Sequence, residues 1–169
     1  MISPSPFVTA WIARLAGHEV RALDVAMGRG RHALPLAHAG FRTFGVDANV
    51  DAVHEAVRAA RDAGSPIRGW CADLTQYPLP AARFELIVVT RYLQRDLFPA
   101  IRDALTPGGI VLYETFTVRQ RALRTGPTSP DHLLHEGELR GYFDDFEIVF
   151  YEEVSSPEAV ARLVARKPS

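Results

Sequence analysis

The chain has 169 residues, of which 47% are hydrophobic and 23% charged, so we expect one globular domain over residues 1–169. The formal net charge of −1 gives no electrostatic reason to expect nucleic acid or an anionic membrane as a partner. No apolar run is long enough to span a bilayer and Cys71 is the single cysteine, so we expect a cytoplasmic protein without an intramolecular disulfide.

Strand-like and helix-like segments alternate along most of the chain, which is typical of a parallel sheet with helices on both faces. The pattern first predicts a helix over 6–17, a strand over 22–27, a glycine loop and helix over 28–40, a strand over 41–47 and a helix over 50–64. It then predicts strands over 66–74, 84–90 and 110–116, with a helix over 97–105 before the last of them.

The chain ends in a different pattern. After a helical piece at 135–143, two apolar strands at 146–153 and 159–167 are separated only by a turn, so they must pair antiparallel. The predicted fold class is α/β, a Rossmann-like doubly wound seven-stranded sheet that is mostly parallel and ends in an antiparallel hairpin. This ending argues against a dinucleotide-binding Rossmann sheet, whose strands are all parallel.

Acidic residues stand at the ends of the first three predicted strands. These are Asp24, Asp47 and Asp73, and the glycine loop 28–30 follows the first of them. Open α/β sheets bind ligands outside the carboxyl ends of their strands. Asp47 suits the two hydroxyls of a ribose, Asp73 suits an exocyclic amine, and the Leu74 N–H suits a ring nitrogen. Together they predict an adenosine site, although each acid alone is also an ordinary residue for capping a turn.

The glycine loop is also compatible with a nicotinamide dinucleotide as the ligand. Residues 28–33 fit G-x-G-x-x-A, and Asp47 lies near the distance expected of an acid that binds the ribose of a nicotinamide dinucleotide. Asp24 argues against that reading, because an acid beside a pyrophosphate is unfavourable. The same acid suits the ammonium group of an amino acid.

Several segments resemble the motifs of class I S-adenosylmethionine-dependent methyltransferases. ALDVAMGRGRHALPLA resembles their first motif, in which an acid precedes a G-x-G-x-G loop, GVD their ribose motif and CADL their adenine motif. FELIVVT and LTPGGIVLYETF are similar to their fourth and fifth strands. GPTSPDHLLHEGELRGYF is similar to a segment of small bacterial methyltransferases related to the tellurite-resistance type, so the resemblance spans essentially the whole chain.

The resemblance implies that S-adenosylmethionine is the cofactor. The residues that it places in the cofactor site are Asp24, Ala26, Gly28, Gly30, Asp47, Ala48, Asp73, Leu74 and Thr90. One position departs from the family pattern, because Ala26 replaces the first glycine of the loop. Since alanine is small, we expect a shifted fit and not a lost site.

The resemblance also implies methyl transfer by in-line displacement to a small-molecule acceptor. Such transfer needs a base only for an acceptor that is protonated at neutral pH, and the candidates are Tyr92, Glu114 and His132. We expect no metal, because His132 and His135 lack a third ligand. Two alternatives stay open, a non-catalytic S-adenosylmethionine-binding module, suggested by Ala26, and an NAD-dependent oxidoreductase. The sequence identifies neither the acceptor nor the oligomeric state.

One long segment, residues 117–130, follows the strand predicted over 110–116 and has neither a helical nor a strand pattern. It contains Arg119, Arg121 and Arg124, which suit either a solvated loop or a lid that attracts an anionic acceptor. A long connection of this kind is usually functional or disordered, so we expect a mobile segment at the acceptor entrance.

Overall fold

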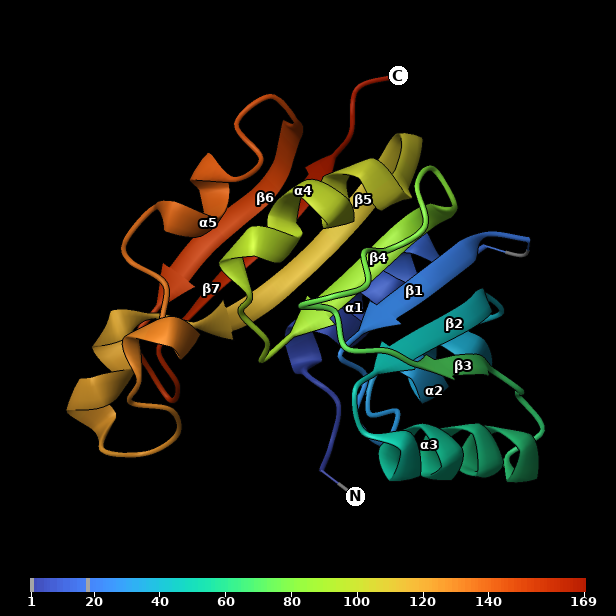
Figure 1. The fold of residues 1–169 in the computed structure, drawn as a ribbon. Helices are drawn as coiled ribbons and strands as arrows, with labels where there is room; N and C mark the ends of the chain where they lie inside the picture. The colour runs from blue at the N-terminus through green and yellow to red at the C-terminus, as the bar shows by residue number, and fades with distance from the viewer. Residues whose placement is uncertain (1, 18) are drawn as a thin grey trace.

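The protein forms one seven-stranded sheet covered by helices on both faces in this computed structural model, which describes residues 2–17 and 19–169 (Figure 1). The strands are β1 (Arg21–Val25), β2 (Arg42–Asp47), β3 (Arg68–Cys71), β4 (Phe84–Thr90), β5 (Leu105–Phe116), β6 (Glu147–Val154) and β7 (Val160–Arg166). They lie in the order β3-β2-β1-β4-β5-β7-β6. Neighbours from β3 to β5 pair parallel, whereas β7 pairs antiparallel with both β5 and β6. The predicted fold class is confirmed.

Alternating side chains of the strands face two helical layers. The helices are α1 (Pro6–Leu15), α2 (Ala33–His38), α3 (Val50–Asp62), α4 (Phe98–Ala104) and α5 (Glu138–Gly141), with short 3-10 helices η1 (Arg95–Leu97), η2 (Val118–Leu123) and η3 (Pro130–His132). Ala22 of β1 packs in the cluster of α1 and α2, and its neighbour Leu23 packs in the cluster of α4 and α5. Within the described residues, no helix is long and apolar enough to cross a membrane.

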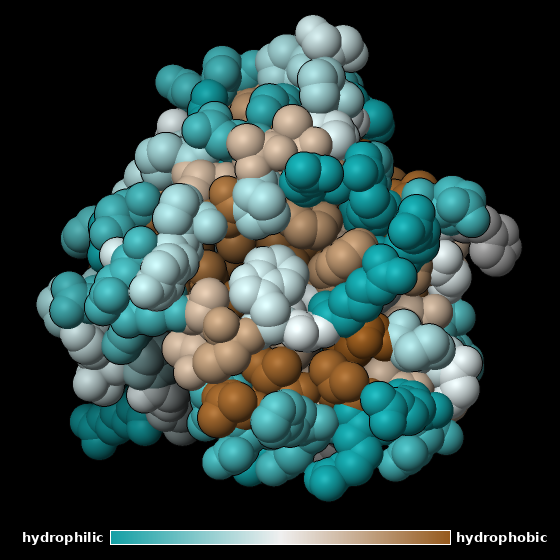
Figure 2. Space-filling model, turned by 45° about the vertical axis from the view of Figure 1, so that its right-hand side comes forward, coloured by the Kyte–Doolittle hydropathy of each residue, from teal (hydrophilic) through white to brown (hydrophobic). Residues whose placement is uncertain are grey.

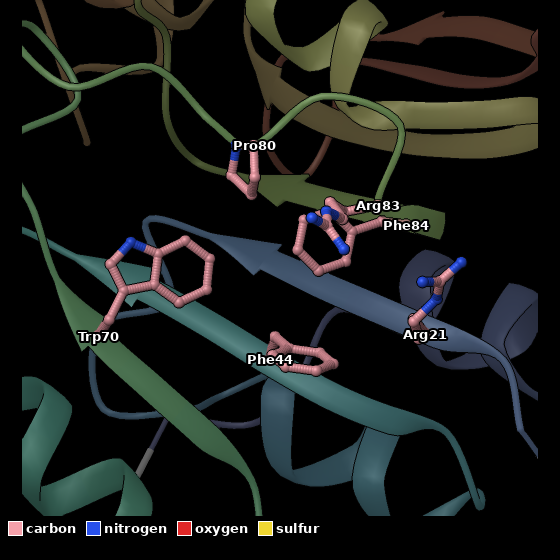
Figure 3. A pocket seen from close by; sticks show the side chains of 6 residues that line it. All are labelled: Arg21, Phe44, Trp70, Pro80, Arg83 and Phe84. Carbon is pink, nitrogen blue, oxygen red and sulfur yellow. The ribbon is translucent and has the colours of Figure 1, made fainter.

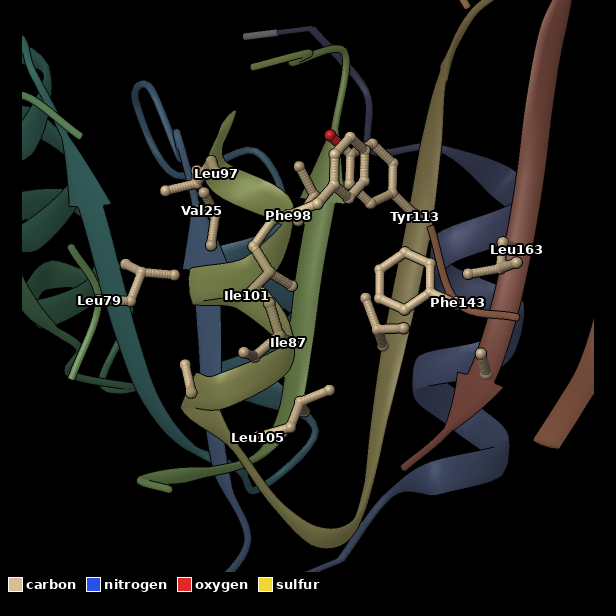
Figure 4. Packing of buried hydrophobic residues seen from close by; sticks show 14 of the residues in the cluster. Val25, Leu79, Ile87, Leu97, Phe98, Ile101, Leu105, Tyr113, Phe143 and Leu163 are labelled. Carbon is tan, nitrogen blue, oxygen red and sulfur yellow. The ribbon is translucent and has the colours of Figure 1, made fainter. Parts of the chain in front are cut away.

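The core on the α4 and α5 side is the larger of the two. Figure 4 shows Phe98 and Ile101 of α4 against the strands, close to Ile87 of β4 and Tyr113 of β5. The rings of Phe98 and Tyr113 stack with their centroids 5.4 Å apart. This packing holds β4 and β5 rigidly side by side, and the candidate acceptor residues follow those two strands.

The crossover between β3 and β4 contains no helix. Residues 72–83, all of which the structure describes, instead run over the α4 side of the sheet as an extended segment (Figure 1). Leu74 and Leu79 anchor this segment by burying their side chains in the core. The sheet face over β1, β2 and β3 is therefore covered by a loop where a helix would otherwise lie.

The segment 117–130 contains more regular structure than its sequence predicts. It begins with η2, and the Gln120 side chain is buried within it. Its oxygen accepts a hydrogen bond from the Ala159 N–H at 2.7 Å, and its nitrogen donates to the Thr125 carbonyl at 2.9 Å. Hydrogen bonds of Gln120, and not apolar contacts, thus anchor this segment. A hydropathy pattern therefore does not reveal the anchor. Mobility of this segment stays a prediction.

Candidate active site

Two adjoining cavities lie at the carboxyl edge of the sheet, where β1, β2 and β4 end. The first, of about 290 Å³, is lined by Ala26, Asp47, Ala48, Ala72, Asp73, Leu74, Arg91 and Tyr92. The second, of about 650 Å³, is lined by Ile2, Ala26, Met27, Gly28, Arg29, Arg31, His32, Thr90 and Arg91. Since Ala26 and Arg91 line both, the cavities form one continuous site. Among the predicted cofactor residues, Asp24 and Gly30 line neither cavity.

The two glycines of the loop have different roles. Both have a left-handed backbone, with φ of 55° at Gly28 and 89° at Gly30. A Cβ at Gly30 would lie 2.4 Å from Leu34 Cδ1 and 3.1 Å from Ala56 Cβ, so this glycine lets the loop pack against α2 and α3. A Cβ at Gly28 would meet nothing within 4 Å and would occupy cavity space. Gly30 therefore has a packing role, and its contact with the cofactor stays a prediction.

Asp47, the last residue of β2, fastens the glycine loop to that strand. One carboxylate oxygen accepts from the Gly28 N–H at 2.8 Å, and the other accepts from the Asn49 N–H at 2.9 Å. A carboxylate offers about four acceptor positions, so both oxygens retain capacity for ligand hydroxyls. Asp47 thus shapes the loop and faces the first cavity at once.

Asp73 lies two residues beyond the end of β3 and caps the turn that follows it. Its Oδ1 accepts from the Thr75 N–H at 2.9 Å and from the Thr75 hydroxyl at 2.6 Å. These hydrogen bonds hold the pKa of Asp73 below its usual value. The turn-capping interpretation is correct for Asp73, and the residue also lines the first cavity, so the two roles coexist.

Asp24 lies beneath the glycine loop in the interior. Its side chain is 1% exposed, and its Oδ2 has no hydrogen-bond partner among the described residues. Burial raises the pKa of Asp24 to about 8, although a hydrogen bond from the Ala33 backbone and the charge of Arg31 oppose that shift. Asp24 is therefore mainly protonated at neutral pH in the free protein, which the sequence did not reveal.

His32 joins the start of the chain to the end of β4. The Ser5 N–H donates to its Nε2 at 2.9 Å, so Nε2 carries no proton and Nδ1 donates to the Thr90 hydroxyl at 2.9 Å. Burial and the charges of Arg31 and Arg91 lower the pKa of His32 to about 3, which keeps the ring neutral. The Thr90 hydroxyl hydrogen is thereby left to donate elsewhere.

Gln94 is a residue that the sequence analysis did not single out. Its side-chain nitrogen donates to the Leu74 carbonyl at 3.1 Å, and its oxygen accepts from the Tyr92 hydroxyl. The Tyr113 hydroxyl donates to the Tyr92 carbonyl at 2.7 Å. These bonds fix Tyr92 at the mouth of the first cavity, and burial raises the pKa of its hydroxyl.

A third cavity, of about 330 Å³, adjoins the first. It is lined by Arg91, Tyr92, Leu93, Thr115, Phe116, Pro127 and His132. Arg91 and Tyr92 line both cavities, so a group bound in one is next to a group bound in the other. Pro127 brings the segment 117–130 into this wall, and His132 reaches it from η3.

Arg91 lies where all three cavities meet. Its backbone φ of 52° is left-handed, a strained conformation for a residue with a side chain. The guanidinium lies 5.4 Å from the centre of the Phe116 ring and donates to both carboxylate oxygens of Glu158, at 2.9 and 3.0 Å. The left-handed backbone at Arg91 thus turns the chain just after β4 ends, and the Arg91 side chain lies where the three cavities meet.

Glu114, a candidate general base, lies away from the three cavities. Glu114 is buried on β5, and its Oε2 accepts from Nε of Arg162 at 2.5 Å. It lines none of the three cavities at this edge. Side chains alternate along a strand, so Glu114 points to the face opposite its neighbour Tyr113. Its role is to pair with β7, whereas Tyr92 and His132 do face the third cavity.

Comparison of the sequence with protein families identifies the family of this chain. Residues 22–109, slightly more than half of the chain, match a family model described as a methyltransferase domain. The chain belongs to this methyltransferase family. The enzyme class predicted from the sequence, a methyltransferase, is thereby confirmed over an NAD-dependent oxidoreductase. No curated protein matches the sequence.

Solved structures share the fold at low sequence identity. TehB from Haemophilus influenzae matches with a TM-score of 0.77 and 19% identity over 94% of this chain and 61% of TehB. A SAM-dependent methyltransferase from Methanosarcina mazei matches with 0.74 and 19% over 99% of both chains. Magnesium protoporphyrin IX methyltransferase from Synechocystis, solved with bound SAH, matches with 0.75 and 18% over 95% of this chain and 80% of its own. This chain therefore spans less than two thirds of the length of TehB.

Residues of the site do not form a metal centre. Among the described residues, no group of three or more His, Cys, Asp or Glu side chains is placed to hold a metal ion.

Ala26 gives a first testable prediction. Its φ of 55° is left-handed, a conformation that costs a non-glycine residue about 1–2 kcal/mol. We expect Ala26→Gly to raise the free energy of unfolding by up to about 1 kcal/mol, because the greater freedom of unfolded glycine offsets part of that relief. Urea unfolding measures the gain, and calorimetry with S-adenosylhomocysteine should show equal or tighter binding. A folded variant that has lost binding would contradict our alignment of this loop with the family motif.

Proposed function

We propose that this protein transfers the methyl group of S-adenosylmethionine to a small-molecule acceptor by in-line displacement. The observation that carries the proposal is the meeting of the three cavities at Arg91, with Tyr92 shared by the first and the third. The third cavity, of about 330 Å³, has the size of a small-molecule site. A donor bound in the first two cavities and an acceptor in the third would be neighbours, as a displacement in one line requires.

The first cavity has the groups that adenosine needs. Asp47 has acceptor capacity for the two ribose hydroxyls, and Asp73 offers a carboxylate to the adenine amine. Leu74 and Ala72 supply apolar walls for a flat ring. We therefore assign the nucleoside part of the cofactor to this cavity, with Ala48 beside the ribose.

The second cavity suits the amino-acid part of the cofactor. Thr90 has a hydroxyl hydrogen to donate, and the guanidinium groups of Arg31 and Arg91 complement a carboxylate. The Oδ2 of Asp24, which is buried and has no hydrogen-bond partner among the described residues, is our candidate to accept from the ammonium group. The open space at Gly28 leaves the loop backbone accessible to the ligand.

The chemistry assigned to the chain is orientation and exclusion of water. S-adenosylmethionine supplies an electrophilic methyl group on its sulfonium when bound. Tyr92 and Arg91 separate the donor from the acceptor and fix the line between them, and Leu93 and Phe116 keep the acceptor cavity apolar. His132 is exposed at the cavity wall and is our candidate to accept a proton from a protonated acceptor.

The ribose contact tests the proposed cofactor site. We expect Asp47→Ala to weaken binding of S-adenosylhomocysteine at least ten-fold, because each hydrogen bond to a charged group contributes about 1.5–3 kcal/mol. Loss of the acceptor for the Gly28 N–H adds to the effect. Isothermal titration calorimetry measures the affinity, and Asp51→Ala, an exposed acid of α3 with the same charge change, is the control. An unchanged affinity in Asp47→Ala would remove Asp47 from the site.

A further inference from the structure

A row of arginines marks the edge of the sheet opposite the cofactor site. Arg21, Arg42 and Arg68 are the first residues of β1, β2 and β3, and Arg83 directly precedes β4. These four strands are neighbours and run parallel, so their first residues share one edge. Arg21 and Arg42 stand opposite each other in the strand register. We call this feature the arginine row.

An apolar cavity of about 520 Å³ opens beside this row. It is lined by Arg21, Phe44, Trp70, Pro80, Arg83 and Phe84, none of which lines a cavity of the candidate active site (Figure 3). The figure shows the side chains of Phe44 from β2 and Trp70 from β3 on the sheet, with Pro80 on the loop that crosses above them. The cavity exists because residues 72–83 replace a covering helix with a loop.

The aromatic walls are only partly covered by the protein. Phe44 and Trp70 are half-buried, and Tyr77 of the same covering loop is 63% exposed. On the face seen in Figure 2, hydrophobic side chains gather at the centre and hydrophilic ones surround them. Because Phe44 and Trp70 are half-buried, a flat apolar ligand in this cavity would remove aromatic surface from water.

Positive charge at this edge is incompletely neutralised. Arg21 pairs with Glu85, and the carboxylate of Glu19 lies 4.0 Å from Arg42. In the part of the chain that the structure describes, neither Arg68 nor Arg83 forms an ion pair. Arg68 instead lies over the Phe44 ring, 5.7 Å from its centre, and both it and Arg83 are exposed.

We infer that this cavity binds a small planar aromatic anion, with the ring against Phe44 and Trp70 and the anionic group on Arg83, while Arg68, which lies over the Phe44 ring beside the cavity, adds positive charge. Guanidinium groups pair with carboxylate, sulfonate or phosphate through two parallel hydrogen bonds, and a ring beside them stacks on aromatic walls. A volume of about 520 Å³ lies within the usual range for small-ligand sites. The site is separate from the cofactor cavities and does not depend on the proposed methyl transfer.

Fluorescence tests this inference with 1-anilinonaphthalene-8-sulfonate as the probe. The chain has two tryptophans, so a Trp11→Phe background leaves Trp70 as the reporter. We expect saturable one-to-one binding that quenches Trp70 and persists when S-adenosylhomocysteine is in excess. Displacement of the probe by excess S-adenosylhomocysteine, or no response of Trp70, would overturn the assignment of this cavity.

Charge-reversal variants separate this site from general attraction. Arg68→Glu with Arg83→Glu is expected to weaken the probe about ten-fold or more, because the anion loses both unpaired guanidinium groups. Arg58→Glu with Arg61→Glu, two exposed arginines of α3, makes the same change in net charge and should leave the affinity within about two-fold. Equal losses in the two double variants would contradict the inference.

Two further probes define the ligand. N-phenyl-1-naphthylamine has the same rings without the sulfonate, and we expect it to bind at least about ten-fold more weakly than the sulfonate. Equal binding of the two would show that the arginine row plays no part. Competition with 2-naphthoate and with naphthyl phosphate distinguishes a carboxylate from a phosphate ligand. Displacement by either supports the site, and displacement by neither contradicts it.

Discussion

Between pH 6.5 and 8, the free energy of unfolding is expected to fall by about 1.4 kcal/mol for each pH unit because of Asp24. Its pKa is raised from 3.8 to about 8 in the folded state, so over this interval the folded protein retains a proton that the unfolded chain has released. Stability from such a group is present at low pH and is lost as the pH rises through the folded pKa. Above pH 8 both states are ionised and the decline stops.

His32 explains why this decline starts near pH 6.5. Its pKa falls from 6.5 to about 3 on folding, so between those values the unfolded chain holds the extra proton and stability rises with pH. The rise from His32 opposes the fall from Asp24 over most of the same interval. Only above pH 6.5 does the contribution of Asp24 act alone among these two groups.

Asp24→Asn separates the two contributions. Asparagine has nearly the same shape, retains an acceptor for the Ala33 backbone and does not titrate. We expect the variant to gain stability up to pH 6.5 and then to stay level, so that its advantage over the natural chain grows by about 2 kcal/mol between pH 6.5 and 8. Urea unfolding at half-unit pH steps measures both curves. Parallel curves from pH 6.5 to 8 would show that Asp24 is already ionised in the folded protein.

The order of the strands and main helices followed from the sequence. Apolar runs such as 84–90 identify buried parallel strands, and the short turn before β7 forces an antiparallel pair. The positions of Asp47 and Asp73 at one edge followed from strand direction alone. These features depend on apolar runs and turns that recur along the chain, and such a pattern is visible in the sequence.

Features that depend on single long-range contacts did not follow. The bond from the Ser5 N–H to His32 joins residues 27 positions apart, and the bond from Gln94 to the Leu74 carbonyl spans 20 positions. No local pattern marks either pair. The position of Glu114 away from the cavities did not follow either, because the start of β5, and hence the face of each residue, is known only to within a residue or two from sequence. One residue of register moves a side chain to the opposite face of the sheet.

The loop that replaces a crossover helix between β3 and β4 is a further feature whose consequences could not be predicted from the sequence. The sequence between β3 and β4 has no strong helical pattern, yet nothing in it shows that Phe44 and Trp70 are left half-buried beneath a loop. The arginine row likewise emerges only when β3, β2, β1 and β4 are placed side by side. Its members are separated by many residues along the chain, so the surface charge is a product of topology.

Gly28→Val is expected to weaken binding of S-adenosylhomocysteine at least about 100-fold, a loss of roughly 2.7 kcal/mol. A Cβ at Gly28 contacts no protein atom within 4 Å, so the added side chain extends into the second cavity, where we place the cofactor. The φ of 55° adds a backbone cost, because a branched side chain is unfavourable in the left-handed region. Calorimetry measures the affinity, and circular dichroism verifies the fold.

Gly64→Val is the matched control for that backbone cost. Gly64 follows α3 with φ of 74°, and a Cβ there also meets nothing within 4 Å, but it lines none of the cavities of the candidate active site. Both variants should therefore lose a similar free energy of unfolding, and Gly28→Val alone should lose the ligand. If both lose it equally, strain and not occupied space is responsible. If Gly28→Val folds and binds normally, the cofactor does not approach the loop at this residue.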